Sequence, residues 1–194
     1  MRGKSLMVIC VLFALGLSAA PAAPAADGPG GAAYQQPTAA SVPSGAAVAQ
    51  PTVPGTEAQI VDGLAVAPEA APIAVKQAIW AANAIIGRPY RYGGGHARGF
   101  LDRGYDCSGT VSYALHGGDL LDTPLDSSSF LRWGERGAGQ WITVYTNPGH
   151  AYAVIAGLRL DTSAAGDPSG LRGPRWRPTL RSSRGFRARH PAGL

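Results

Sequence analysis

One cysteine stands in a sequence context that favours thiol chemistry. Cys107 follows a glycine-rich stretch and precedes a short apolar run, residues 111–115, after which two glycines occur at 117–118. This pattern predicts a helix that begins at the cysteine and ends at a glycine cap. Because unpaired amides and the dipole at a helix N-terminus stabilise anions, a thiolate is expected there. Most free cysteines are buried packing residues, but the flanking Asp106 and Ser108 favour a reactive site.

A histidine and an acid that suit a thiol nucleophile follow later in the chain. His150 opens a predicted strand, and Asp161 lies eleven positions on, near the end of the next strand. If the two strands pair about Gly157, the acid comes close to the histidine. It then accepts a hydrogen bond from one ring nitrogen and leaves the other for the thiol. Alone, either residue is more simply explained as a turn or cap residue; the order cysteine, histidine, acid favours catalysis.

The remaining candidate bases and ligands are poorly placed. His116 lies nine residues along the helix of Cys107, which separates the two by roughly 13 Å. The four histidines show no metal-ligand spacing. The second cysteine, Cys10, falls inside the expected signal peptide, so the mature chain has no partner for a disulfide. We therefore expect neither a metal ion nor another cofactor.

The elements that must position these residues predict an α+β domain. A helical pattern with an apolar stripe covers residues 72–86 and stops at Gly87. After the cysteine helix, strand patterns occur at residues 140–145, 150–156 and 158–162. Helices followed by an antiparallel meander predict N-terminal helices, one of them carrying the cysteine, packed on an antiparallel sheet.

Composition divides the chain into four parts. Residues 1–26 combine a basic start, an apolar run and small-residue cleavage sites, which is typical of a secretory signal peptide. A secreted or cell-envelope protein is therefore expected, without stable membrane insertion after cleavage. Residues 27–72 are rich in alanine, proline and glycine and are expected to form a disordered spacer. The folded domain is expected over residues 73–170, followed by an arginine-rich tail over residues 171–194.

Positive charge is concentrated at the C-terminal end. The formal net charge is +5, and residues 171–194 hold seven arginines and no acid. Such a tail either attracts anionic wall polymers or serves solubility and packing. Nucleic acid is not an expected partner, and a monomer is expected.

These motifs resemble those of the NlpC family of papain-like bacterial cell-wall cysteine peptidases. The resemblance covers about residues 73–165 and rests on Gly-Arg-Pro-Tyr-Arg-Tyr-Gly-Gly at 87–94, Asp-Cys-Ser-Gly at 106–109 and Gly-His at 149–150. It implies a papain-like fold and hydrolysis of amide bonds in peptidoglycan stem peptides, typically between γ-D-glutamyl and a diamino acid. Peptidoglycan or its muropeptides would then be the substrate.

The resemblance also implies a role for each matching residue. The catalytic positions are Cys107 as nucleophile, His150 as base and acid, and Asp161 as the orienting group, where the family often has another histidine. Asp106 and Ser108 match positions that bind the substrate's free amine in some members. Tyr90 matches an aromatic residue beside the cysteine.

Two other functions stay open at this stage. One is a catalytically idle wall-binding protein that acts through its basic tail, and the other is a papain-like amidase or acyltransferase. The ordered cysteine, histidine and acid argue against the idle protein. The sequence does not separate the peptidase from the amidase or acyltransferase.

Overall fold

The computed structural model describes residues 50–194. The expected signal peptide, residues 1–26, and the first part of the expected spacer, residues 27–49, lie outside the described residues. The helices are α1 (Ile73–Ile85), α2 (Cys107–Gly117) and α3 (Ser127–Phe130). The strands are β1 (Thr52–Val53), β2 (Gln59–Val61), β3 (Leu64–Pro68), β4 (Glu135–Arg136), β5 (Ile142–Asn147), β6 (His150–Ile155), β7 (Leu158–Asp161), β8 (Arg175–Arg177) and β9 (Arg187–His190). Within this part of the chain, no helix has the length and apolarity to cross a bilayer.

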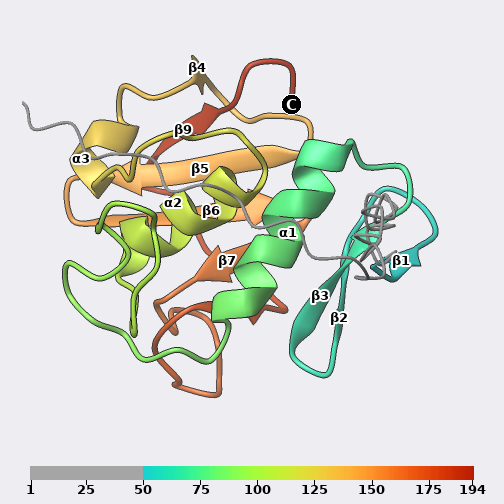
Figure 1. Cartoon of the computed structure of the whole chain (residues 1–194), viewed down its shortest axis with the longest axis horizontal. Helices are drawn as coiled ribbons and strands as arrows, with labels where there is room; N and C mark the ends of the chain where they lie inside the picture. Colours follow the sequence, from blue (N-terminus) through green and yellow to red (C-terminus); the bar gives the residue numbers. More distant parts are fainter. Residues whose placement is uncertain (1–49) are drawn as a thin grey trace, which may run out of the picture. The chain divides into compact units, whose positions relative to one another are not determined.

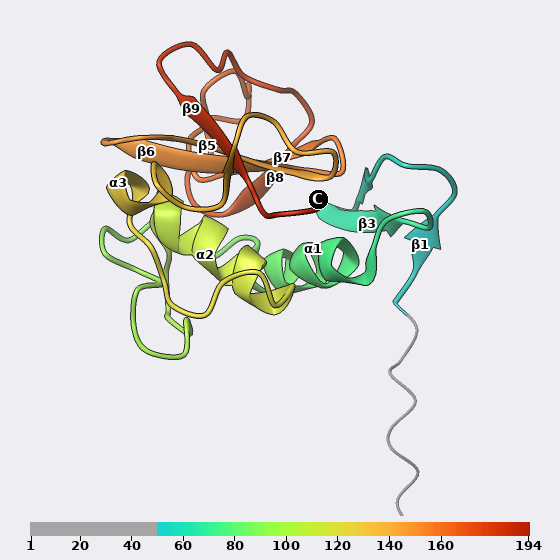
Figure 2. The same cartoon turned by 90° about the horizontal axis from the view of Figure 1, so that it is seen from above.

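Six strands form one antiparallel sheet in the order β4-β9-β5-β6-β7-β8 (Figure 1). Helix α2 packs on β6 and β7, and α3 packs on β5 and β6. Figure 2 shows the helices on one side of this sheet and the loops that lead into β9 on the other. The predicted α+β class, with the cysteine helix packed against an antiparallel sheet, is confirmed.

Helices α1 and α2 pack closely because their contact is made by small residues. The buried side chains of α1 recur every three or four positions: Val75, Ala78, Ile79, Ala82 and Ile85. At the C-terminal end of α2, a Cβ added at Gly117 would lie 2.1 Å from the Cβ of Ala81. A Cβ at Gly118 would lie 2.5 Å from the carbonyl oxygen of Ala74. The two glycines therefore end the helix and also let α1 approach it.

The end of the expected spacer is ordered, which corrects the prediction of disorder up to residue 72. Strands β1, β2 and β3 form a small sheet, and β2 and β3 are joined by a turn at Asp62-Gly63 in which both residues have positive φ. Asn83 of α1 accepts from the backbone N–H of Ala65 and donates to its carbonyl. Four alanines of this segment are buried in the core: Ala58, Ala65, Ala67 and Ala71. Small buried side chains and hydrogen bonds to the backbone hold this segment in place. The prediction of disorder was wrong because it counted only large apolar residues, of which the segment has few.

The arginine-rich segment is also part of the fold, which corrects the predicted domain limit at residue 170. Strand β8 pairs with β7, and β9 lies between β4 and β5. Trp176 of β8 is buried, and its indole N–H donates to Asn83 Oδ1 at 2.8 Å. Arg177 is buried and pairs with Asp167. Neighbouring side chains of a strand leave opposite faces, so Trp176 and Arg177 are buried on opposite sides of β8. The described domain therefore extends over residues 50–194.

Candidate active site

Cys107 is the first residue of α2, as the sequence predicts. Asp106 caps this helix: its Oδ1 accepts from the amide of Gly109 at 2.7 Å. Its Oδ2 accepts from the amide of Gly93 at 2.9 Å, which ties the glycine-rich loop to the start of the helix. The thiol-bearing residue is only 9% exposed. The helix N-terminus therefore presents the cysteine from a fixed position.

The glycines of the two motifs are needed for close backbone contact. A Cβ at Gly109 would lie 2.0 Å from the carbonyl oxygen of Gly94, and one at Gly94 would lie 2.2 Å from that of Gly104. An isolated bridge between Tyr90 and Tyr105 holds the same loop alongside the residues that lead into α2. The glycine-rich approach thus forms one wall of the cysteine site, since no larger residue would allow this packing.

The hairpin of β6 and β7 brings His150 and Asp161 together. Ile155 pairs with Leu158 across the turn, so the start of one strand lies beside the end of the other. His150 Nε2 and Asp161 Oδ1 are 2.9 Å apart. This is the proximity that the strand pattern predicts, and it leaves the other ring nitrogen, Nδ1, for the cysteine.

Buried hydrogen bonds keep His150 protonated and Asp161 ionised. Burial alone lowers the pKa of His150, but the hydrogen bond to Asp161 and the nearby side chain of Cys107 outweigh it and raise the pKa to about 9. Burial likewise raises the pKa of Asp161, but the hydrogen bonds from His150 and from the Ser163 amide outweigh it, so that this pKa is lowered. At neutral pH the histidine is therefore an imidazolium that is held by the ionised carboxylate of Asp161.

The C-terminal segment supports this pair, a contribution that the sequence analysis missed. Arg181 donates to Asp161 Oδ2 at 3.2 Å, and its guanidinium carbon lies 5.3 Å from the ring centre of Tyr152 and 5.2 Å from that of Phe186. The ring of Phe186 meets that of His150 edge-on, with centres 6.2 Å apart. Arg181 is twenty residues from Asp161 and lies in a loop, so no spacing rule connects the two.

His96 is a second residue that the sequence analysis did not assign to the site. Its Nε2 lies 3.0 Å from Asp106 Oδ1 and 3.3 Å from Ser108 Oγ. The hydrogen bond to Asp106 is the main reason that the pKa of His96 is raised. Asp106 and Ser108, both predicted to bind substrate, therefore form a buried polar cluster with this histidine. The signal for it was its position directly after Gly93-Gly94-Gly95.

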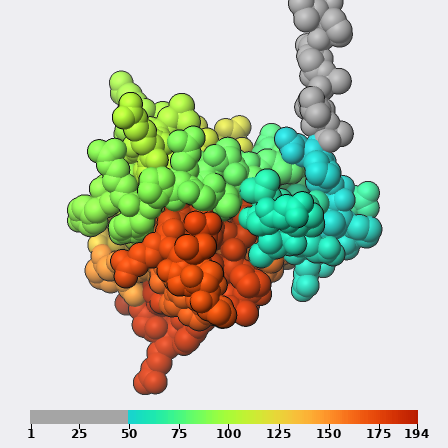
Figure 3. Space-filling view, turned by 90° about the horizontal axis from the view of Figure 1, so that it is seen from below, coloured from blue at the N-terminus to red at the C-terminus, as the bar shows by residue number. Residues whose placement is uncertain are grey.

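Two pockets flank the cysteine and histidine, and Tyr90 lines both. One, of about 430 Å³, includes Cys107 in its lining, together with two acids, Asp106 and Asp126, and one base, His96. The other, of about 480 Å³, is lined by His150 and residues of the segment after β7, with Arg172 as its charged residue. Figure 3 shows the surface of the segment before α2, in green, meeting that of the segment after β7, in orange-red. The two pockets thus differ in charge: the cysteine side has two acids against one histidine, and the other side has Arg172 and His150 and no acid.

The site has no built metal centre. Among residues 50–194, no group of three or more histidine, cysteine, aspartate or glutamate side chains is placed to hold a metal ion. The chemistry that the arrangement supports is nucleophilic attack by a thiolate, with proton transfer through an oriented imidazole.

Comparisons with known proteins give a partial structural likeness. No protein-family model matches the chain, and no curated protein matches it. The chain is similar to the solved structure of the peptidoglycan hydrolase RipB from Mycobacterium tuberculosis, with 24% identity, a TM-score of 0.43, and coverage of 60% of this chain and 64% of that chain. The match thus spans less than two thirds of the neighbour's length. A likeness of this extent does not transfer the neighbour's activity to this chain.

Proposed function

We propose that this chain is a secreted cysteine peptidase that hydrolyses amide bonds in peptidoglycan stem peptides. The observation that carries the proposal is the hydrogen-bonded pair of His150 and Asp161 beside Cys107 at the start of α2. The resemblance of the surrounding motifs to the NlpC family supports the choice of substrate. The expected signal peptide supports action outside the cytoplasm.

The reaction proceeds through a thioester on Cys107. The thiolate attacks the amide carbonyl, and the carbon–nitrogen bond breaks as the proton of the His150 imidazolium passes to the leaving amine. The now neutral imidazole takes a proton from a water molecule, which attacks the thioester and releases the acid. Asp161 stays ionised throughout, holds the ring orientation and stabilises the imidazolium.

The first turn of α2 supplies donors for the oxyanion of the tetrahedral intermediate. Asp106 already accepts from the amides of Gly109 and Thr110, through its side chain and its carbonyl respectively. The amides of Cys107 and Ser108 have no carbonyl one turn earlier within the helix. They are therefore the backbone donors that this site offers to a developing negative charge.

The charge difference between the two pockets fits a stem peptide cut between γ-D-glutamyl and a diamino acid. The acidic pocket, with Asp106 and Asp126, suits the free amine of the part that forms the thioester. The basic pocket, with Arg172, suits a carboxylate of the diamino acid that leaves. Tyr90 lies against both parts of the substrate.

Incubation of the mature chain with purified muropeptides, followed by mass analysis of the products, tests this proposal. We expect a mass gain of one water per cut and new ends at γ-D-glutamate and the diamino acid, and we expect Cys107→Ala to give no product. Arg172→Ala should raise KM for substrates with a free carboxylate on the diamino acid. Arg184→Ala, at an exposed arginine that lines neither pocket, is the matched control and should leave KM unchanged.

The same experiment separates the other two functions. Transfer of the acyl group to an added amine in preference to water would indicate an acyltransferase. Absence of any product, together with binding of muropeptides, would indicate a catalytically idle wall-binding protein. Either result would overturn the peptidase assignment.

A further inference from the structure

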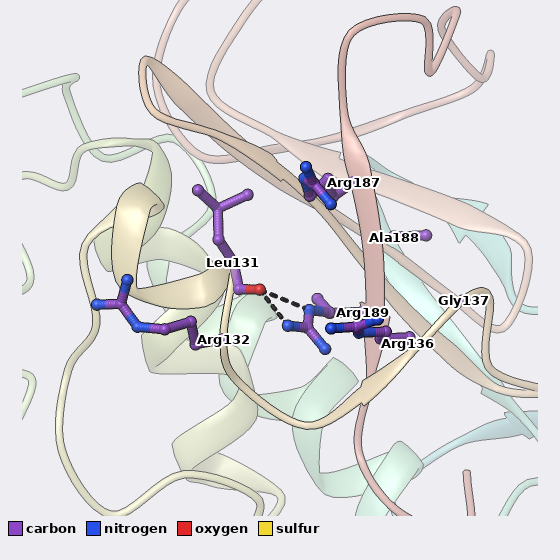
Figure 4. Close-up of a pocket in the computed structure, with 7 residues that line it drawn as sticks. All are labelled: Leu131, Arg132, Arg136, Gly137, Arg187, Ala188 and Arg189. Atoms are coloured by element: carbon purple, nitrogen blue, oxygen red, sulfur yellow. Dashed lines mark hydrogen bonds between the residues drawn. The ribbon is translucent and has the colours of Figure 1, made fainter.

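A separate pocket of about 510 Å³ lies where the end of α3 faces β4 and β9 (Figure 4). Seven residues line it: Leu131, Arg132, Arg136, Gly137, Arg187, Ala188 and Arg189. Four of them are arginines and none is an acid. We propose that this pocket binds the phosphate groups of a phosphodiester-linked polyanion. The site is distinct from the cysteine site, and the proposal does not depend on the peptidase function.

The register of the two strands places like charges together on the pocket side. Arg136 of β4 is directly opposite Arg189 of β9, and Arg187 is two residues before Arg189, so its side chain leaves the same face of the strand. Like charges directly opposite each other on adjacent strands destabilise a sheet. A bound anion would remove this repulsion.

The acid nearest to the pocket arginines on these strands, Glu135, is paired with another residue. Glu135 precedes Arg136 and therefore points to the other face of β4. It is paired with His190, with 3.4 Å between Glu135 Oε2 and His190 Nε2. The charges of β4 and β9 are thus divided between two faces, and the pocket face has only arginines.

One arginine of the pocket is fixed and the others are free to bind. Arg189 donates through Nε to the carbonyl oxygen of Leu131 at 2.8 Å, as Figure 4 shows. Arg132, Arg136 and Arg187 are exposed, and within residues 50–194 none of them has an ion pair or a side-chain hydrogen bond. By contrast, Arg177 and Arg181 of the same C-terminal segment are paired with acids. A guanidinium offers several donors in a planar fork, which suits the oxygens of phosphate.

The surroundings favour a flexible phosphodiester polymer over nucleic acid or a membrane. None of the seven lining residues is aromatic, whereas single-stranded nucleic acid is held largely by stacking on aromatic rings. The exposed large apolar side chains of the described residues lie outside the lining, so there is no apolar surface here to enter a bilayer. The pocket is also larger than one phosphate group requires, which leaves room for a polymer segment.

The pocket is close to the candidate active site through α3. Ser127, at the start of this helix, lines the acidic pocket beside Cys107, and Leu131, directly after its end, lines the arginine pocket. Four residues of helix correspond to roughly 6 Å. A polymer held by the arginines would therefore keep the enzyme beside a surface that carries it.

Binding of a fluorescent glycerol-phosphate oligomer to the whole mature chain tests the proposal. The affinity is measured by anisotropy as a function of salt concentration, for wild type and for the double variant Arg136→Gln/Arg187→Gln. We expect the double variant to bind about tenfold more weakly and to show a shallower salt dependence, by about one to two in the log–log slope. The matched control is Arg98→Gln/Arg184→Gln, which removes the same charge from exposed arginines outside the pocket and should change the affinity less than twofold.

Each alternative result overturns the proposal in a defined way. Equal loss in both double variants would mean diffuse attraction with no site. Affinity that does not increase from inorganic phosphate to the oligomer would mean a site for a single phosphate group. Tighter binding, at equal phosphate concentration, to a single-stranded oligonucleotide or to anionic phospholipid vesicles would assign the surface to those partners instead. The melting temperature of the free pocket variant should be close to that of wild type, which shows that a loss of binding is not a loss of folding, and the oligomer should raise the melting temperature of wild type more.

Discussion

Replacing Asp161 with asparagine separates the chemical role of this residue from its role in packing. The carboxylate is fully buried and accepts from His150 at 2.9 Å, from the Ser163 amide at 2.8 Å and from Arg181 at 3.2 Å. Asparagine keeps the shape and one acceptor oxygen but loses the charge. Its amide group can donate to Nε2, which moves the ring proton to the nitrogen that faces Cys107. That tautomer cannot accept a proton from the thiol.

The expected effects on rate and on stability are both large. The rise in the pKa of His150 from 6.5 to about 9 corresponds to ~3 kcal/mol of preference for the imidazolium, to which Asp161 contributes directly. We expect kcat to fall on the order of 10²- to 10⁴-fold. Because the change also leaves Arg159 and Arg181 without their negative partner, the free energy of unfolding should fall by about 3 kcal/mol.

Turnover per folded molecule and melting temperature must therefore be measured on the same samples. Asp167→Asn is the matched control, because it removes the carboxylate that pairs with Arg177 and leaves the imidazole untouched. It should lower the melting temperature and leave kcat close to that of wild type. Full turnover in Asp161→Asn, or an equal loss of turnover in Asp167→Asn, would refute an orienting role for Asp161.

Three further predictions follow from contacts of the same structure. Because the pKa of His150 is higher in the folded state than in the unfolded state, protonation of this residue stabilises the fold fully below pH 6.5, and this stabilisation is lost as the pH rises through about 9. The free energy of unfolding, measured as a function of pH, should therefore fall by up to ~3 kcal/mol over this range. His150→Gln should abolish this dependence on pH. Arg181→Met removes a cation that competes with His150 for Asp161, so the alkaline limb of kcat/KM should move to higher pH and return in Arg181→Lys; an unmoved limb would reduce Arg181 to a packing residue. Asn83→Ala leaves the N–H and carbonyl of Ala65 and the indole of Trp176 without partners, and chemical denaturation should show a loss of about 2–4 kcal/mol.

The parts of the site that follow from local patterns were predictable from the sequence. The position of Cys107 follows from a helix that starts after an N-cap aspartate, and the approach of Asp161 to His150 follows from a tight hairpin turn at Gly157. Both depend on neighbours that are close in the sequence. Their roles in catalysis stay predictions until the variants are measured.

The parts that depend on contacts between distant segments were not predictable. The N-terminal hairpin is held by the side chain of Asn83, and Trp176 reaches the same side chain from the other end of the domain. Arg181 reaches Asp161 from a loop, and His96 reaches Asp106 from an irregular stretch. In each case a polar side chain finds its partner only through the tertiary fold, and composition therefore indicated a disordered spacer and an arginine-rich tail outside the domain.

The most direct test of the thiol mechanism is the intact mass of the protein after rapid acid quenching during turnover of a stem peptide. The account predicts a transient gain equal to the γ-D-glutamyl fragment minus water, mapped by peptide mass analysis to Cys107 and absent from Cys107→Ala. Hydrolysis that continues with no such adduct, and at an unchanged rate in Cys107→Ala, would contradict it.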